Sequence, residues 1–160
     1  LATLSPVRGR GTIYDVETAG GSFRIVDESY IASPAAVRAA LDVIAMMPVT
    51  GRRIFVLGDM LELGAAGPAE HAALAAATAA ADIDAVFTAG PLAKQLQDAL
   101  PTARRGAHAA ESAALAATVA SFVRPGDLVL VKGSAGARMG TVVQALKALG
   151  LHGSEARRAL

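Results

Sequence analysis

Residues 125–140, PGDLVLVKGSAGARMG, join an apolar run to a glycine-rich turn and then to the start of a helical segment. An apolar run without alternating polar residues is typical of a strand that is buried on both faces of a parallel sheet. The same order occurs twice upstream, where RIFVLGD (53–59) and DAVFTAG (84–90) each reach a glycine before a helical segment. Strands that alternate with helices predict βαβ units and a parallel sheet.

The rest of the chain fits this architecture. Residues 11–18 and 22–27 are strand-like and flank a pair of glycines, which predicts a hairpin. Ser33 and Pro34 are favourable N-cap and first-turn residues for a helix over 33–47. We expect a short strand over 103–109 and a polar tail over 151–160 that frays. Further helices are expected over 68–81, 91–100, 111–123 and 137–149. The prediction is one doubly wound α/β domain, with a mostly parallel sheet of about six strands and helices on both faces.

Composition excludes several classes of function. The chain has no cysteine, so disulfides and thiolate metal sites are ruled out, and its histidines are far apart in the sequence, so we expect no metal site. The net charge is +1 and the basic residues are scattered, which argues against a nucleic-acid partner. No apolar run is long enough to span a bilayer and no signal peptide is visible, so we expect no membrane insertion and a cytoplasmic location.

Polar residues follow three of the expected strands, in VDES, LGDMLELG and VKGSAG. Ligands of doubly wound sheets bind beyond the carboxyl ends of the strands, and parallel strands share that edge. We therefore expect Asp27, Glu28, Asp59, Lys132 and Ser134 to lie along one edge of the sheet and to form a binding site.

Each of these motifs also has a simpler interpretation. The glycines of VKGSAG either bind an anion at a helix start, together with Lys132 and Ser134, or only form a tight turn. The turn matches neither the dinucleotide fingerprint nor the P-loop, so the chain has no recognisable phosphate cradle of its own. Asp59 could lie in a solvated loop, His71 could be a packing or surface residue, and the two adjacent acids could contact the following helix start.

The order of the motifs resembles the C-terminal domain of the Mur ligases over residues 5–149. The matching segments are GRG (9–11), VDESYIASP (26–34), AALDVIA (39–45), GRRIFVLGDMLELG (51–64) with a helical histidine after it, and PGDLVLVKGSAG (125–136). The resemblance implies a Rossmann-like fold for residues 1–160, with a core over 5–150. It also implies that the UDP-substrate domain and the central ATPase domain lie outside this chain.

The resemblance implies an ATP-dependent ligase that adds D-alanyl-D-alanine to UDP-N-acetylmuramoyl-tripeptide through an acyl phosphate, in the synthesis of peptidoglycan precursors. ATP and Mg²⁺ would be held mainly by the central domain, and this domain would close the active site. Arg10 and either Asp27 or Glu28 correspond to nucleotide-binding residues. Lys132, Ser134 and Asp59 correspond to residues near the amine substrate. No catalytic residue is expected within this domain alone, and the isolated domain should be inactive.

The chain departs from the family pattern, which has two aspartates followed by Ser-Tyr-Asn-Ala-Asn-Pro. Here Glu28, Ile31 and Ser33 replace an aspartate and two asparagines, and Ala135 stands where the family usually has arginine. Two alternatives therefore remain beside the ligase domain: a stand-alone nucleotide-binding module and a non-catalytic interaction domain. A P-loop upstream in the same polypeptide would distinguish the ligase from both.

Overall fold

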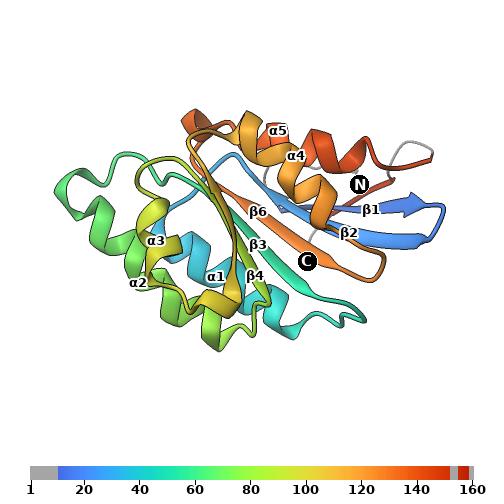
Figure 1. Cartoon of the computed structure of the whole chain (residues 1–160), viewed down its shortest axis with the longest axis horizontal. Helices are drawn as coiled ribbons and strands as arrows, with labels where there is room; N and C mark the ends of the chain where they lie inside the picture. The colour runs from blue at the N-terminus through green and yellow to red at the C-terminus, as the bar shows by residue number, and fades with distance from the viewer. Residues whose placement is uncertain (1–10, 152–154, 159–160) are drawn as a thin grey trace, which may run out of the picture.

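The computed structural model describes residues 11–151 and the backbone of residues 155–158. The described strands form one sheet in the order β5-β4-β3-β6-β2-β1-β7 (Figure 1). Strands β2 to β6 pair in parallel, whereas β1 runs antiparallel to both β2 and β7. The strand bounds are Thr12–Thr18 (β1), Gly21–Glu28 (β2), Arg53–Gly58 (β3), Ala85–Ala89 (β4), Arg105–Ala109 (β5), Leu128–Lys132 (β6) and Glu155–Arg158 (β7).

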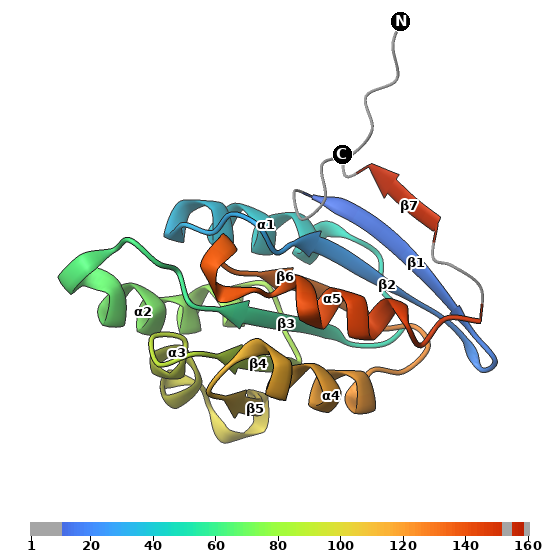
Figure 2. The ribbon, with the colours of Figure 1, turned by 90° about the horizontal axis from the view of Figure 1, so that it is seen from above.

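Helices cover both faces of the sheet, as predicted (Figures 1 and 2). One face carries α1 (Pro34–Met46), α2 (Gly67–Ala80) and α3 (Lys94–Ala99). The other carries α4 (Ser112–Phe122) and α5 (Gly140–Lys147). Each layer has its own apolar core, and the central strands β3, β4 and β6 contribute to both because they are almost wholly buried. Within the described residues, no helix has the length and apolar composition that a membrane crossing requires.

Helix α1 follows the sequence prediction closely. The Ser33 hydroxyl accepts a hydrogen bond from the backbone N–H of Ala36 at 3.1 Å, and proline occupies the first turn. Val37, Leu41 and Ile44 recur at helical spacing and are buried against the sheet. Capping and periodicity therefore account for the start and the buried face of this helix. The Arg53 guanidinium of β3 donates to the carbonyls at its end.

Three expectations need correction. The tail does not simply fray, because residues 155–158 form β7, which pairs with the otherwise open edge of β1 and brings the sheet to seven strands. Helix α3 begins at Lys94 instead of residue 91, after a turn over residues 91–93 in which the Asp59 carboxylate accepts a hydrogen bond from the backbone N–H of Ala93. Helix α5 begins at Gly140, after a 3-10 turn over Ala135–Ala137.

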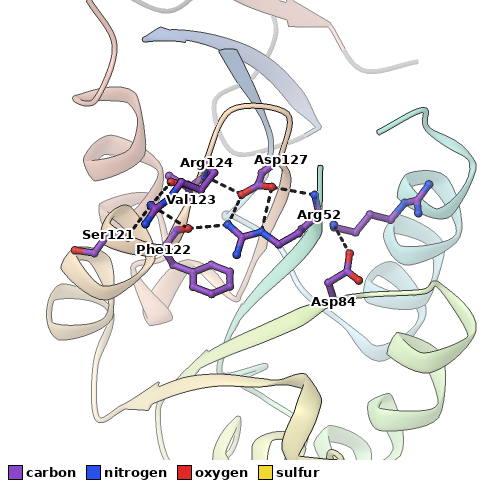
Figure 3. Close-up of polar contacts among 8 residues, drawn as sticks. Arg52, Asp84, Ser121, Phe122, Val123, Arg124 and Asp127 are labelled. Carbon is purple, nitrogen blue, oxygen red and sulfur yellow. Dashed lines mark hydrogen bonds and ion pairs between the residues drawn. The ribbon is translucent and has the colours of Figure 1, made fainter. Parts of the chain in front are cut away.

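The amino ends of the parallel strands are closed by a network around Asp127 (Figure 3). Its carboxylate accepts hydrogen bonds from the backbone N–H and the guanidinium of Arg52, at 2.7–3.2 Å, and from the backbone N–H of Arg124 at 2.8 Å. The Arg52 guanidinium also donates to the Phe122 carbonyl and lies 4.0 Å from the centre of the Phe122 ring. These groups bind one another, so the network joins the segments that precede β3 and β6. Ligand binding is therefore expected at the opposite end of the sheet.

Candidate functional site

The carboxyl ends of β2, β6 and β3 meet at one edge of the sheet. Glu28 is in register with Lys132 across β2 and β6, and Leu57 is in register with Lys132 across β3 and β6. Asp59 and Ser134 directly follow this edge, and a backbone hydrogen bond of 3.2 Å joins the Ser134 N–H to the Asp59 carbonyl. The structure thus brings together the predicted residues that it describes. Arg10 lies outside the described residues.

The two adjacent acids of β2 face different pockets. Successive side chains of a strand point to opposite faces of the sheet. Asp27 therefore lies on the face of α5, whereas Glu28 lies on the face of α1. The two acids therefore lie in two separate environments.

The first of these is a cavity of about 350 Å³, here called the Asp27 pocket. The Asp27 carboxylate is 1% exposed, and its Oδ1 accepts hydrogen bonds from the Ser29 N–H and hydroxyl at 3.1 and 2.6 Å. Arg138 lines the same pocket in a left-handed backbone conformation, with φ of 56°. A carboxylate and a guanidinium on one wall can bind hydroxyls and an anion respectively. The lining residues are Asp27, Ser29, Tyr30, Ala135, Arg138, Gly140 and Gln144.

The second environment is a groove of about 260 Å³ beside α1, here called the Lys132 groove. The side chain of Lys132 is 3% exposed, and its ammonium lies 3.2 Å from Glu28 Oε2. An ammonium has three hydrogen-bond donors, and Glu28 is the partner recorded among the described residues. The walls are apolar, so Glu28 compensates a cation that is otherwise surrounded by hydrocarbon. The lining residues are Val26, Glu28, Ala36, Ala39, Ala40, Val43 and Lys132.

Asp59 lines a third cavity of about 170 Å³, the Asp59 pocket. Its Oδ1 accepts a hydrogen bond from the backbone N–H of Ala93 at 2.7 Å. Gly90 makes this approach possible, since a Cβ at that position would lie 2.4 Å from Asp59 Oδ1. Glu111 and the buried Ser112 lie on the opposite wall, at the start of α4. The pocket thus combines a carboxylate, a hydroxyl and the free N–H groups of a helix start.

Ser134 links the loops that follow β3 and β6. Its hydroxyl oxygen accepts a hydrogen bond from the backbone N–H of Leu61 at 2.9 Å. The hydroxyl proton is then still available to donate to a ligand, since a serine both accepts and donates. Glu62 is exposed, as expected of a residue in a solvated loop. Asp59 is only 7% exposed, so the solvated-loop interpretation does not fit this residue.

The described residues contain no cluster of three or more histidine, cysteine or acidic side chains that could hold a metal ion. The sequence patterns predict neither Arg138 nor Ser112 as a site residue. Nothing in the local sequence signals that either residue lines a pocket, because the chain brings Arg138 to Asp27 and Ser112 to Asp59 only through the sheet.

The fold and these pockets define a doubly wound α/β domain whose polar groups gather at the carboxyl edge of the sheet. A family model described as Mur ligase, glutamate ligase domain, matches residues 9–135. The chain belongs to this family.

Individual relatives point the same way. The chain is 36% identical to the UDP-N-acetylmuramoyl-tripeptide–D-alanyl-D-alanine ligase of Escherichia coli, over 92% of this chain and 31% of that protein. It is 31% identical to the Bacillus subtilis enzyme of the same name, over 89% of this chain and 32% of that one. The MurF ligase of Thermotoga maritima, solved in complex with ADP, superposes with a TM-score of 0.73 at 27% identity, over 93% of this chain and 33% of that one. The chain thus spans about a third of the length of these relatives.

Proposed function

We propose that this chain is the C-terminal domain of an ATP-dependent ligase that joins D-alanyl-D-alanine to UDP-N-acetylmuramoyl-tripeptide in the synthesis of peptidoglycan precursors. The observation that supports this most directly is the gathering of polar pockets at one sheet edge, in a chain 36% identical to a ligase of that name. The domain's contribution is to close over the reacting groups of the complete enzyme, which also contains a UDP-substrate domain and a central ATPase domain.

The Asp27 pocket is the proposed nucleotide contact. Its carboxylate suits ribose hydroxyls, because Oδ2 has no hydrogen bond recorded within the described residues and can accept one. Arg138 supplies positive charge for a phosphate. Arg10, which lies outside the described residues, is proposed as a further contact to the same ligand because of its place in the family motif GRG. ATP and Mg²⁺ would be held mainly by the central domain.

The amine substrate is assigned to the groups beyond β3 and β6. In the proposed reaction ATP phosphorylates the tripeptide carboxylate, and the amine of the dipeptide attacks that carbonyl, so that an amide forms and phosphate leaves. Asp59 can orient the ammonium before it loses its proton, and the Ser134 hydroxyl can donate to a substrate oxygen. Lys132 offers its unused donors to the dipeptide carboxylate.

Steady-state kinetics of the complete polypeptide test the function. Release of phosphate should require both UDP-N-acetylmuramoyl-tripeptide and D-alanyl-D-alanine. Lys132→Ala should lower kcat/KM for the dipeptide by about tenfold or more, because a charge-assisted hydrogen bond contributes about 1.5–3 kcal/mol. Arg138→Asn keeps a residue that tolerates positive φ and should raise KM for ATP instead. Arg38→Ala, on the exposed face of α1, is the control. A polypeptide that binds Mg-ATP tightly but forms no amide would favour a nucleotide-binding module.

A further inference from the structure

His71 is wholly buried in the second turn of α2, yet it makes two hydrogen bonds to backbone groups. Its Nε2 lies 2.9 Å from the backbone nitrogen of Met60, and its Nδ1 lies 2.6 Å from the carbonyl oxygen of Gly67. A backbone N–H only donates and a carbonyl only accepts. These contacts therefore require a neutral imidazole with the proton on Nδ1 and a lone pair on Nε2.

The bond to Met60 holds a loop that has no regular secondary structure. Residues 59–63, here called the Asp59 loop, leave β3 at the carboxyl edge. Three consecutive residues of this loop are each fixed by a different partner. Asp59 binds the N–H of Ala93, the N–H of Met60 binds His71, and the N–H of Leu61 binds the Ser134 hydroxyl. Without His71, Met60 would lose its hydrogen bond to α2.

An apolar side chain could fill the same space, but it could not satisfy the loop. Met60 is 0% exposed, so its N–H has no route to water if the imidazole is absent. Buried backbone donors are almost always paired, and an unpaired one drives the chain to rearrange. The nearest route to water is outward movement of the Asp59 loop, which would separate Leu61 from Ser134 and reshape the pocket that Asp59 lines.

We propose that His71 is a positioning residue: its single tautomer pins Met60 and thereby holds Asp59 and Leu61 against the loop that follows β6. Leu61 is held closely there, because a Cβ on Gly136 would lie 2.7 Å from Leu61 Cδ1. His71 itself contacts no ligand. Its effect on catalysis rests on the proposed function, whereas its effect on the loop does not.

Two substitutions separate the hydrogen bonds of the imidazole. In His71→Gln the amide oxygen reaches the position of Nε2 and keeps the bond to Met60, while the bond to Gly67 is lost. In His71→Asn the amide nitrogen reaches the position of Nδ1 and keeps the bond to Gly67, while Met60 loses its acceptor. Both variants remove one hydrogen bond and the aromatic ring, but Asn is also one methylene smaller than Gln. His71→Leu is therefore the packing control, because leucine fills the space and offers Met60 no acceptor: its Met60 amide exchange should match that of His71→Asn if the acceptor decides, and that of His71→Gln if only packing decides.

The experiment combines hydrogen exchange and kinetics. Exchange of the Met60 and Leu61 amides should be about tenfold faster in His71→Asn than in His71→Gln. In the complete ligase, His71→Asn should raise KM for D-alanyl-D-alanine about tenfold, with KM for ATP unchanged. Equal exchange in the two variants would overturn the proposal, and so would unequal exchange with an unchanged KM for the dipeptide.

A wild-type measurement covers the case in which His71→Asn fails to fold. The ¹⁵N spectrum of the wild-type imidazole should show a protonated Nδ1 and an unprotonated Nε2, and the opposite tautomer would overturn the proposal. If the wild-type polypeptide forms no amide bond, the proposed function fails, while the exchange rates and the tautomer still decide whether His71 holds the loop.

Discussion

The ion pair between Lys132 and Glu28 predicts an asymmetric response to mutation. The two side chains differ in exposure, at 3% for Lys132 and 29% for Glu28. In Lys132→Met the remaining carboxylate can turn toward water, and the new side chain is apolar like its surroundings. In Glu28→Gln the remaining ammonium stays buried beside a neutral amide. We therefore expect Glu28→Gln to destabilise the fold more than Lys132→Met does.

The expected loss of unfolding free energy in each variant follows from how far each charge is buried. Breaking a fully buried ion pair costs about 3–5 kcal/mol, and the partial exposure of Glu28 lowers this to about 2–3 kcal/mol for Glu28→Gln. For Lys132→Met the free energy of unfolding should change by less than about 1 kcal/mol, since the buried charge itself is removed. A domain of this size loses about 2–4 °C in Tm per kcal/mol, so Glu28→Gln should lower Tm by about 4–12 °C.

Urea unfolding of the chain and of both single variants measures the difference directly, and the double variant completes the cycle. Glu28→Gln combined with Lys132→Met should recover most of the stability lost in Glu28→Gln alone, because no buried charge is left to compensate. Equal losses in the two single variants, or a larger loss in Lys132→Met, would refute the reasoning. A stable Lys132→Met variant would also separate folding from function, since the same change should lower kcat/KM in the complete ligase.

Three further outcomes are expected. Ile31→Asn should leave Tm and ligase activity unchanged, because Ile31 is 49% exposed and no packing is lost; a clear fall in Tm would contradict this. Burial and the charge of Lys94 lower the pKa of His108 below its ordinary value; the unfolded state thus binds the proton more tightly, and stability is lost as pH falls below about 6.5. The fall in unfolding free energy between pH 7.5 and 5.5 should accordingly be smaller in His108→Gln than in the wild type. The isolated chain should bind Mg-ATP more weakly than the micromolar range, which needs about 8 kcal/mol net; a low-micromolar dissociation constant in titration calorimetry would contradict the ligase-domain assignment.

Local patterns were sufficient to predict most of the fold. The apolar runs of β3, β4 and β6 and the Ser33-Pro34 start of α1 are signals within a few residues, and the structure confirms them. The main error arose where a distant partner decides. Strand β7 pairs with β1, which lies near the other end of the chain, so no local sequence pattern predicts that this part of the tail forms a strand.

The roles of the candidate site residues are still harder to predict from the sequence, because they depend on which face of a strand each residue occupies. Asp27 and Glu28 are adjacent and have the same charge, so the sequence presents them as interchangeable. Alternation along β2 sends Asp27 to the pocket with Arg138 and Glu28 to the ion pair with Lys132. Glu28 stands where the family pattern has an aspartate, and its longer side chain reaches Lys132 on the neighbouring strand at 3.2 Å. In the proposed ligase, Asp27 would therefore contact the nucleotide directly, whereas Glu28 would act on a ligand through the lysine that it holds in place.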